Sequence, residues 1–250
     1  MNDPAKGSAF FRFTRIRAGA VAALLAVGVL AVSVIRVAGT ASAAEEAFVI
    51  PAPALDNPKA AGATQTAVLA GGCFWGVQGV FEHLTGVKRV VSGYSGGGAG
   101  NAQYETVCGG GTGHAESVEI TFDPAQVTYG QILRVFFSVA HDPTQLNRQG
   151  PDHGTQYRSA IFYSDAAQKR LADAYIAQLD KAKVYPAAIV TRVDPLKGFF
   201  AAEDYHQDFL LKNPSHPYIV YNDLPKIRNF QKVLPELYRG KPVTVASSEP

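Results

Sequence analysis

The sequence is poor in cysteine: its 250 residues include two, Cys73 and Cys108. In an oxidising compartment an even pair can form one structural disulfide. A domain of about 200 residues nevertheless has enough core to fold without a bridge, and hydrophobic residues make up 47% of this chain. The composition therefore predicts a globular domain whose stability does not depend on disulfides.

Basic residues are also scarce once the first 43 residues are set aside. Five of the 23 lysines and arginines lie there, but only one of the 21 acidic residues does. The remaining 18 basic and 20 acidic side chains give a net charge of −2. No basic block follows, so we expect no nucleic acid partner.

Motifs for phosphate and metal binding are absent as well. The glycines at 96–98 lack the G-x-x-x-x-G-K-[ST] spacing that cradles phosphates. The six histidines form no H-x-x-x-H or H-x-x-E-H pair, and "EDYH" at 203–206 comes nearest to a metal cluster. We therefore expect neither a metal nor another cofactor.

The first 43 residues have the order of an export signal. Three arginines precede an apolar run at 18–35, and small residues follow at 41–43. This order predicts a secretory signal peptide over 1–43. The run is longer than usual, so an uncleaved membrane tether through 18–35 is the alternative. Both interpretations place the remaining chain in the periplasm or another extracytoplasmic compartment.

The rest of the chain divides into an arm and one domain. Residues 44–64 are rich in Ala and Pro without a hydrophobic period, which predicts a flexible arm before a domain over 65–250. Hydrophobic periods predict strands at 66–70, 87–94, 115–122, 158–163 and 187–193, and helices at 73–86, 128–140, 166–183, 201–212 and 227–237.

The order of these elements indicates the fold class. From Thr66 to Tyr163 it is β-α-β-β-α-β, the order of the ferredoxin-like split βαβ arrangement, with helices on one face of a mixed sheet. We therefore predict an α+β domain with additional C-terminal helices and a long irregular tail.

Cys73 lies in "AGGCFWG", between two glycines and two aromatic rings at the predicted start of a helix. The first N–H groups of a helix have no intrahelical partner, and the helix dipole favours an anion there. We therefore expect a lowered thiol pKa and a nucleophilic Cys73. Gly71 and Gly72 are expected to leave access to the sulfur, and Phe74 and Trp75 to wall a small apolar pocket.

Glu116 is the second candidate, because of its place in "AESVEITF". It shares a strand face with Val118, Ile120 and Phe122, which points its carboxyl group toward the core or a cleft in it. Desolvation there raises a carboxyl pKa, so Glu116 is a candidate general acid. The segment 151–159, "PDHGTQYRS", adds more polar side chains than a plain connector needs.

Several blocks of the chain, in this order, resemble the A-type peptide methionine sulfoxide reductases. The resemblance runs from Thr66 to Tyr221 and rests on "GGCFWG", "GYSGG", "YETVCGGGTGHAESVEITFDP", "HDPTQ", "DHGTQYRSAIFY" and "EDYHQDFLLKNP". It implies thiol-dependent reduction of methionine S-sulfoxide, free or in proteins, through a cysteine sulfenic acid. It also implies repair of oxidised exported proteins by a chain that we expect to be monomeric.

The resemblance also implies a role for each site residue. It makes Cys73 the nucleophile, Phe74 and Trp75 the methyl pocket, Glu116 the acid that protonates the departing oxygen, Tyr104 and Tyr157 the phenols that hydrogen-bond this oxygen, and Asp152 a further polar residue. Sulfoxide reduction needs a soft nucleophile, a proton for oxygen and an apolar socket, and these residue types supply them. Such chemistry requires no metal or nucleotide.

The chain departs from many family members in its tail, because Gln207 to Pro250 contains no cysteine. A thioredoxin-like or other external thiol is therefore expected to reduce the Cys73 sulfenic acid. The alternative is that Cys108 resolves it through a disulfide, which requires the two Cα atoms to lie close together. "GPDHG" also has Pro151 where Asn is commoner in the family, to which we assign no function.

Two other classes of function fit parts of the sequence. A Cys/His hydrolase or acyl transferase would use Cys73 with His153 or His206 as the base. An exported binding domain would use Cys73 and Cys108 as a structural bridge.

Overall fold

The computed structural model describes residues 47–245 of the chain. The predicted signal peptide at 1–43, with its alternative of a tether through 18–35, lies outside these residues. Within 47–245, no helix combines the length and the hydropathy needed to cross a membrane.

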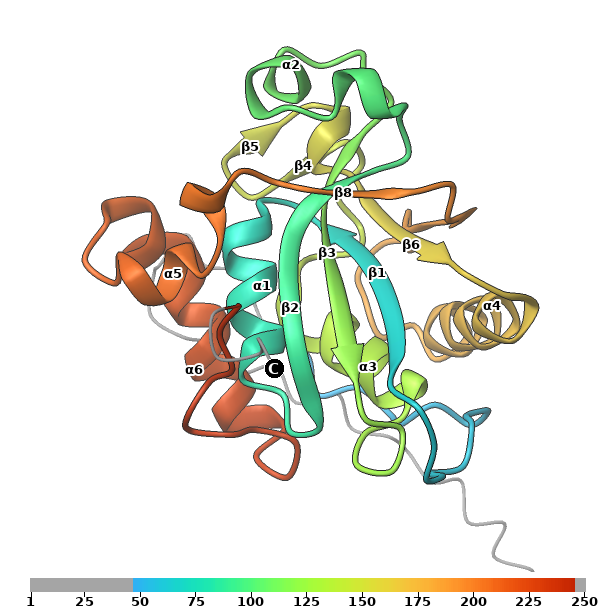
Figure 1. Ribbon diagram of the computed structural model, residues 1–250. Coiled ribbons are helices and arrows are strands. Elements are labelled where there is room, and N and C mark those ends of the chain that lie inside the picture. Colours follow the sequence, from blue (N-terminus) through green and yellow to red (C-terminus); the bar gives the residue numbers. More distant parts are fainter. Residues whose placement is uncertain (1–46, 246–250) are drawn as a thin grey trace, which may run out of the picture. The chain divides into compact units, whose positions relative to one another are not determined.

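Six strands form one mixed sheet in the order β7-β6-β1-β3-β2-β8 (Figure 1). The pair β6–β7 is parallel, and every other neighbouring pair is antiparallel. The six are β1 (Gln65–Gly71), β2 (Val87–Ser95), β3 (Ala115–Phe122), β6 (Ser159–Tyr163), β7 (Arg192–Pro195) and β8 (Phe199–Ala201). A separate short ladder pairs β4 (Arg148–Gln149) with β5 (Asp152–His153). Together with the helices, this sheet confirms the predicted α+β class.

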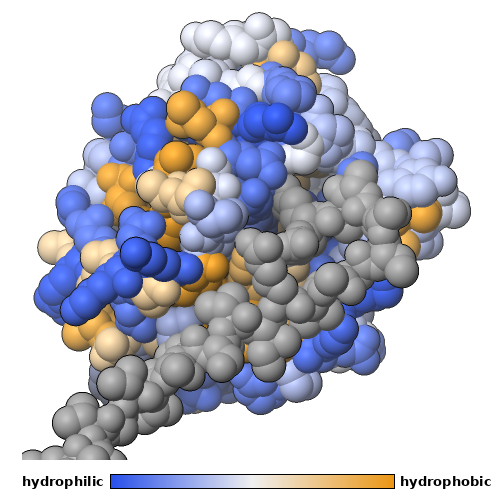
Figure 2. Space-filling model, turned by 180° about the vertical axis from the view of Figure 1, so that it is seen from behind, coloured by the Kyte–Doolittle hydropathy of each residue, from blue (hydrophilic) through white to orange (hydrophobic). Residues whose placement is uncertain are grey.

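The four longer helices cover one face of the sheet: α1 (Phe74–Glu82), α3 (Tyr129–Val135), α4 (Ala166–Lys181) and α6 (Leu224–Val233). The short helices are α2 (Tyr104–Cys108) and α5 (Phe209–Lys212). Buried side chains of the longer helices join the main core, which includes Phe81, Tyr175 and Phe230. On the opposite face a smaller cluster around Phe162 is covered by Leu196 and Phe199, from the chain that leads into β8. Seen from behind, the surface is mostly hydrophilic with smaller hydrophobic groups (Figure 2).

Two predicted helices are shorter or less regular than the sequence suggests. The helix predicted at 128–140 begins with Thr128, whose side chain forms a capping box with Gln131, but it is α-helical only to Val135 and continues as a π-helix over Phe136–Ala140. The last helix begins at Leu224 rather than at 227, with Pro225 in its first turn.

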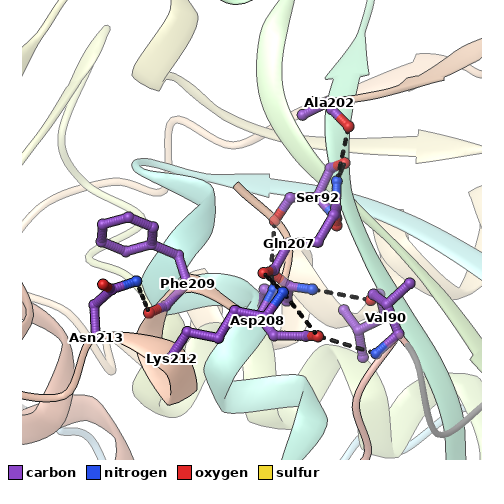
Figure 3. Close-up of polar contacts among 10 residues, drawn as sticks. Val90, Ser92, Ala202, Gln207, Asp208, Phe209, Lys212 and Asn213 are labelled. Carbon is purple, nitrogen blue, oxygen red and sulfur yellow. Dashed lines mark hydrogen bonds and ion pairs between the residues drawn. The ribbon is translucent and has the colours of Figure 1, made fainter. Parts of the chain in front are cut away.

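The helix predicted at 201–212 is wrong over most of its length, because Gln207 bonds to the sheet instead. Its amide donates to the carbonyls of Ser92 (2.9 Å) and Ala202 (3.0 Å), and its oxygen accepts the Ser92 N–H at 2.9 Å (Figure 3). The next residue, Asp208, adopts the left-handed conformation (φ 54°). Only α5 therefore remains α-helical, after a 3₁₀ turn at Asp204–His206.

The strand predicted at 187–193 begins later, at Arg192. Before that point the Val190 N–H donates to the carbonyl of Pro143 at 2.8 Å, so this part of the chain bonds to a loop rather than to β6.

Residues 47–56 pack against the domain, whereas the sequence predicts a flexible arm over 44–64. Phe48 and Ile50 are buried in the core. The Phe48 N–H donates to the Ser138 carbonyl at 3.1 Å, and Asp56 accepts hydrogen bonds from the first turn of α3, including the Gly130 N–H at 2.9 Å. The arm lacks a hydrophobic period because it adds single apolar side chains to the core without forming a helix or strand of its own.

Candidate active site

Cys73 lies between β1 and α1 as the N-cap residue of the helix, and it is 9% exposed. The Trp75 backbone N–H donates to its sulfur. Gly72 makes the turn into the helix with a φ of +91°, and a Cβ there would lie 2.5 Å from Gln149. A Cβ on Gly71 would lie 3.0 Å from Phe136. The two glycines therefore make room for the protein's own side chains, not for access to the sulfur as the sequence predicts.

The predicted lowering of the Cys73 pKa is wrong. Burial raises the pKa of this thiol well above its usual range, and the carboxyl groups of Glu116, Asp223 and Asp152 raise it further when they are ionised. The hydrogen bond from Trp75 acts in the opposite direction but is the smaller effect. Cys73 is therefore a neutral thiol in the resting protein.

Glu116 has the burial that its strand parity predicts. It is 3% exposed on β3, opposite Tyr94 of β2, and its Oε2 accepts the backbone N–H of Phe74 at 2.9 Å. Burial raises its pKa to about 8, against the lowering effect of the Phe74 hydrogen bond. The carboxyl group is therefore protonated at neutral pH. It is hydrogen-bonded to the backbone of Phe74, the residue that follows the candidate nucleophile Cys73.

The two aromatic residues after Cys73 differ in their surroundings. Phe74 is fully buried (1% exposed), and its ring contacts those of Tyr94 and His206. Trp75 is half-buried, stacks on Phe209 with ring centroids 3.9 Å apart, and donates from Nε1 to His206 Nδ1 at 3.1 Å. Trp75 is therefore the ring that can face a substrate, and Phe74 and Trp75 both pack against His206.

Tyr104 and Cys108 lie on α2 and share a hydrogen bond. The Tyr104 phenol donates to the Cys108 sulfur, which is half-exposed and has a pKa raised mainly by burial. The Tyr104 backbone N–H donates to Glu203 Oε1 at 2.9 Å, and its ring packs on His206. Cys73 and Cys108 are both free thiols. The alternative of a structural Cys73–Cys108 bridge is therefore wrong.

Asp152 and Tyr157 approach the same site from another part of the chain. Asp152 lines a small cavity with Cys73, and its carboxylate accepts the phenol O–H of Tyr218. Tyr157 is half-buried, and its pKa is raised by burial and by the nearby charges of Glu116 and Asp152. The structure thus brings together all the residues that the sequence singles out: Cys73, Phe74, Trp75, Tyr104, Cys108, Glu116, Asp152 and Tyr157.

Five further residues complete the site, all from the C-terminal third of the chain: Glu203, His206, Tyr218, Asp223 and Lys226. The sequence indicates His206 only as the base of a hydrolase and, with Glu203, as part of "EDYH", the nearest approach to a metal motif. It does not single out Tyr218, Asp223 or Lys226. Within residues 47–245, no group of three or more His, Cys, Asp or Glu side chains is arranged to hold a metal ion.

Comparison with known proteins decides the family. The family model for peptide methionine sulfoxide reductase matches residues 65–237. The chain belongs to this family. It is 64% identical over 192 residues to peptide methionine sulfoxide reductase MsrA 2 of Mesorhizobium japonicum, covering 77% of this chain and 98% of that one. It is 56% identical to MsrA 2 of a Synechocystis species, over 74% of this chain and 87% of the relative.

Solved structures of peptide methionine sulfoxide reductases share the fold. Methionine sulfoxide reductase A of Corynebacterium diphtheriae is 36% identical, with a TM-score of 0.55 over 66% of this chain and 87% of its own. Mxr1 from Saccharomyces cerevisiae in reduced form is 32% identical, with the same TM-score over 65% of this chain and 92% of its own. The predicted A-type peptide methionine sulfoxide reductase is confirmed, and with it thiol-dependent reduction of methionine S-sulfoxide.

The hydrolase alternative loses its support in this family. His206 Nδ1 accepts a hydrogen bond from Trp75, and His153 is exposed on β5. The groups that act on the Cys73 thiol are instead carboxyl groups and a backbone N–H.

Proposed function

We propose that Cys73 and Glu116 carry out the reduction as a pair. Glu116 donates its proton to the sulfoxide oxygen while the Cys73 sulfur attacks and bonds to the sulfoxide sulfur, and the resulting Glu116 carboxylate takes up the thiol proton. The substrate S–O bond and the new S–S bond then break as the oxygen moves to the Cys73 sulfur. Cys73 becomes a sulfenic acid, and methionine leaves. The observation that supports this proposal is the buried, protonated Glu116 bound to the N–H next to Cys73.

The remaining site residues bind and orient the substrate in this proposal. Trp75, stacked on Phe209, offers an apolar surface for the methyl group, and Phe74 packs with it against His206. The Tyr157 phenol donates to the sulfoxide oxygen, and the Tyr104 phenol does the same once the substrate draws its O–H away from the Cys108 sulfur. Asp152 holds Tyr218 on the opposite side of the site.

An external thiol then returns Cys73 to its reduced form, and a thioredoxin-like protein would supply that thiol. The alternative is that Cys108 of the same chain reduces the Cys73 sulfenic acid by forming a disulfide with it. Cys108 is a free, half-exposed thiol that is hydrogen-bonded to Tyr104. The methionine sulfoxide is free or within proteins, and the enzyme acts as a monomer.

The apolar run at 18–35 and the small residues at 41–43 support export, by a cleaved signal peptide or with a membrane tether. The function would then be repair of oxidised proteins outside the cytoplasm. We also infer a ferredoxin-like split core, which the strand order β6-β1-β3-β2 and its antiparallel pairs support.

A single turnover without added reductant tests this proposal. Reduced protein is mixed with the S epimer of a methionine sulfoxide peptide, and both are weighed by mass spectrometry. One equivalent of methionine and one oxygen gained on Cys73 is the expected result. Methionine with a loss of two hydrogens would make Cys108 the resolving residue. A failure to form methionine would contradict the pair mechanism.

A further inference from the structure

A buried ion pair lies beside the first turn of α1. Asp223 is 0% exposed and Lys226 is 5% exposed, and the Lys226 Nζ lies 3.5 Å from Asp223 Oδ1. Both face Gly76, where a Cβ would lie 2.1 Å from Asp223 Oδ1 and 3.2 Å from Lys226 Nζ. Taking two charges out of water costs free energy that their mutual attraction does not always recover. A buried pair beside the residue next but two to the nucleophile therefore points to a function.

Lys226 also lines a small polar cavity that opens onto Cys73. The cavity has a volume of about 10 Å³, close to the space that one water molecule occupies. Its lining is Cys73, Gln149, Gly150, Pro151, Asp152, Tyr218, Asn222 and Lys226. It therefore has room for a single oxygen atom next to the sulfur, such as the oxygen of a Cys73 sulfenic acid.

Reduction of a sulfenic acid requires a proton at that oxygen. An incoming thiolate forms an S–S bond with Cys73 while the S–O bond breaks, and the oxygen leaves as water only if it gains a proton. Among the ionisable groups of the cavity, Asp152 accepts a hydrogen bond from the Tyr218 phenol. The Tyr218 O–H is therefore already used in this hydrogen bond. The amides of Gln149 and Asn222 do not give up protons at neutral pH. Glu116, the acid of the first step, accepts the Phe74 N–H and does not line this cavity. The Lys226 ammonium is therefore the proton donor of the cavity.

We propose that Lys226 protonates the oxygen of the Cys73 sulfenic acid as a thiol displaces it, and that Asp223 positions the Lys226 ammonium. The step is Cys73–SOH + R–S⁻ + Lys–NH₃⁺ → Cys73–S–S–R + H₂O + Lys–NH₂. The cysteine sulfur is reduced, the incoming thiol is oxidised, and the amine recovers its proton from a second thiol. This inference rests on the proposed function, because it concerns the recycling of the same Cys73.

The test separates recycling from sulfoxide reduction by preparing the sulfenic acid independently. Full-length protein is oxidised with hydrogen peroxide until Cys73 has gained one oxygen, then mixed with dithiothreitol, and the loss of dimedone-reactive sulfenic acid is timed by mass spectrometry. We expect Lys226→Met to slow this loss by about a hundredfold or more, because general acids contribute about 10²–10⁴-fold. Lys232→Met, an exposed residue on the same helix, is the matched control and should match the wild type.

Lys226→Arg distinguishes proton donation from charge. Arginine keeps Asp223 paired but does not release its proton, so we expect recycling as slow as in Lys226→Met. A wild-type recycling rate in Lys226→Arg would overturn the proposal. Lys226→Met leaves the Asp223 carboxylate buried without its lysine partner. If that variant fails to fold, the double variant Asp223→Asn/Lys226→Met removes this charge and takes its place. The recycling rate of Lys226→Arg then still shows whether Lys226 donates a proton. A wild-type protein that recycles but forms no methionine from the sulfoxide would contradict the proposed function and leave this inference intact.

Discussion

The two sides of the active site are built in different ways. Cys73 lies between β1 and α1, Phe74 on α1 and Glu116 on β3, and backbone hydrogen bonds hold these elements in register. The other side is a covering segment, residues 203–226, which side-chain contacts hold across long stretches of sequence. Gln207 bonds to Ser92, 115 positions away, and Glu203 to Tyr104, 99 positions away. Regular secondary structure therefore positions Cys73 and Glu116, whereas a few buried polar side chains hold the covering segment in place. Loss of one of these side chains should weaken the attachment of the covering segment without displacing Cys73 or Glu116.

Removing the nucleophile should have the largest effect. In Cys73→Ser the hydroxyl group cannot replace the soft sulfur, so we expect no detectable methionine in a single turnover. Cys108→Ser should still form one equivalent, measured as peptide methionine by mass spectrometry. Methionine production by Cys73→Ser would show that the regular side of the site does not hold the nucleophile.

Replacing Glu116 by Gln should lower kcat/KM by about 10²–10⁴-fold, because general acid catalysis is lost. The folded-state pKa of Glu116 is raised to about 8, so its acid form is lost as pH rises through 8. The wild-type rate should therefore fall above pH 8, and this limb should disappear in Glu116→Gln. Glu119→Gln, on the other face of β3, is the control and should keep the wild-type profile. An unchanged pH profile in Glu116→Gln would assign the acid to another residue.

Gln207→Leu should weaken the attachment of the covering segment to the sheet. It leaves the Ser92 N–H and the Ala202 carbonyl without the Gln207 amide, whereas the Ser92 carbonyl still accepts the Ala202 N–H. We expect a loss of about 2–4 kcal/mol in the free energy of unfolding. The exposed Gln231→Leu should change it by less than about 0.5 kcal/mol. Urea denaturation measures both, and equal stabilities would mean that Gln207 does not anchor this segment.

Gly76→Ala tests the place where the two sides meet. Alanine is the better helix former, yet its Cβ would clash with the Asp223 carboxylate. We expect a loss of about 1–3 kcal/mol in the free energy of unfolding. Gly98→Ala has nothing within 4 Å of its Cβ and should be neutral. A more stable Gly76→Ala protein would show that the ion pair is free to move away from α1.

The sequence predicts β1, α1 and β3 well and the covering segment poorly. Strand parity alone predicts that Glu116 is buried, and the three-and-four spacing after Cys73 predicts α1. Both patterns repeat within a few residues, so each can be recognised locally. The Gln207 contact that replaces the helix predicted at 201–212 joins distant residues, and no local period encodes it.

The error over the Cys73 pKa has the same origin. The helix start is a local feature and favours a thiolate, but burial and three carboxyl groups from distant segments outweigh it. Glu116, Asp152 and Asp223 become neighbours of the sulfur only when the chain is folded. The residue types of the site were therefore predictable, but their electrostatic balance was not.

Trp75 is the single tryptophan of the chain, which makes its position useful for spectroscopy. Its indole stacks on Phe209 and donates to His206, so its fluorescence will report how the covering segment sits on α1 in both the reduced and the oxidised enzyme. Burial lowers the His206 pKa, so protonation of this acceptor should change the emission only in acid, below pH 6.5. The protein thus carries an intrinsic optical probe at the point where its substrate is proposed to bind.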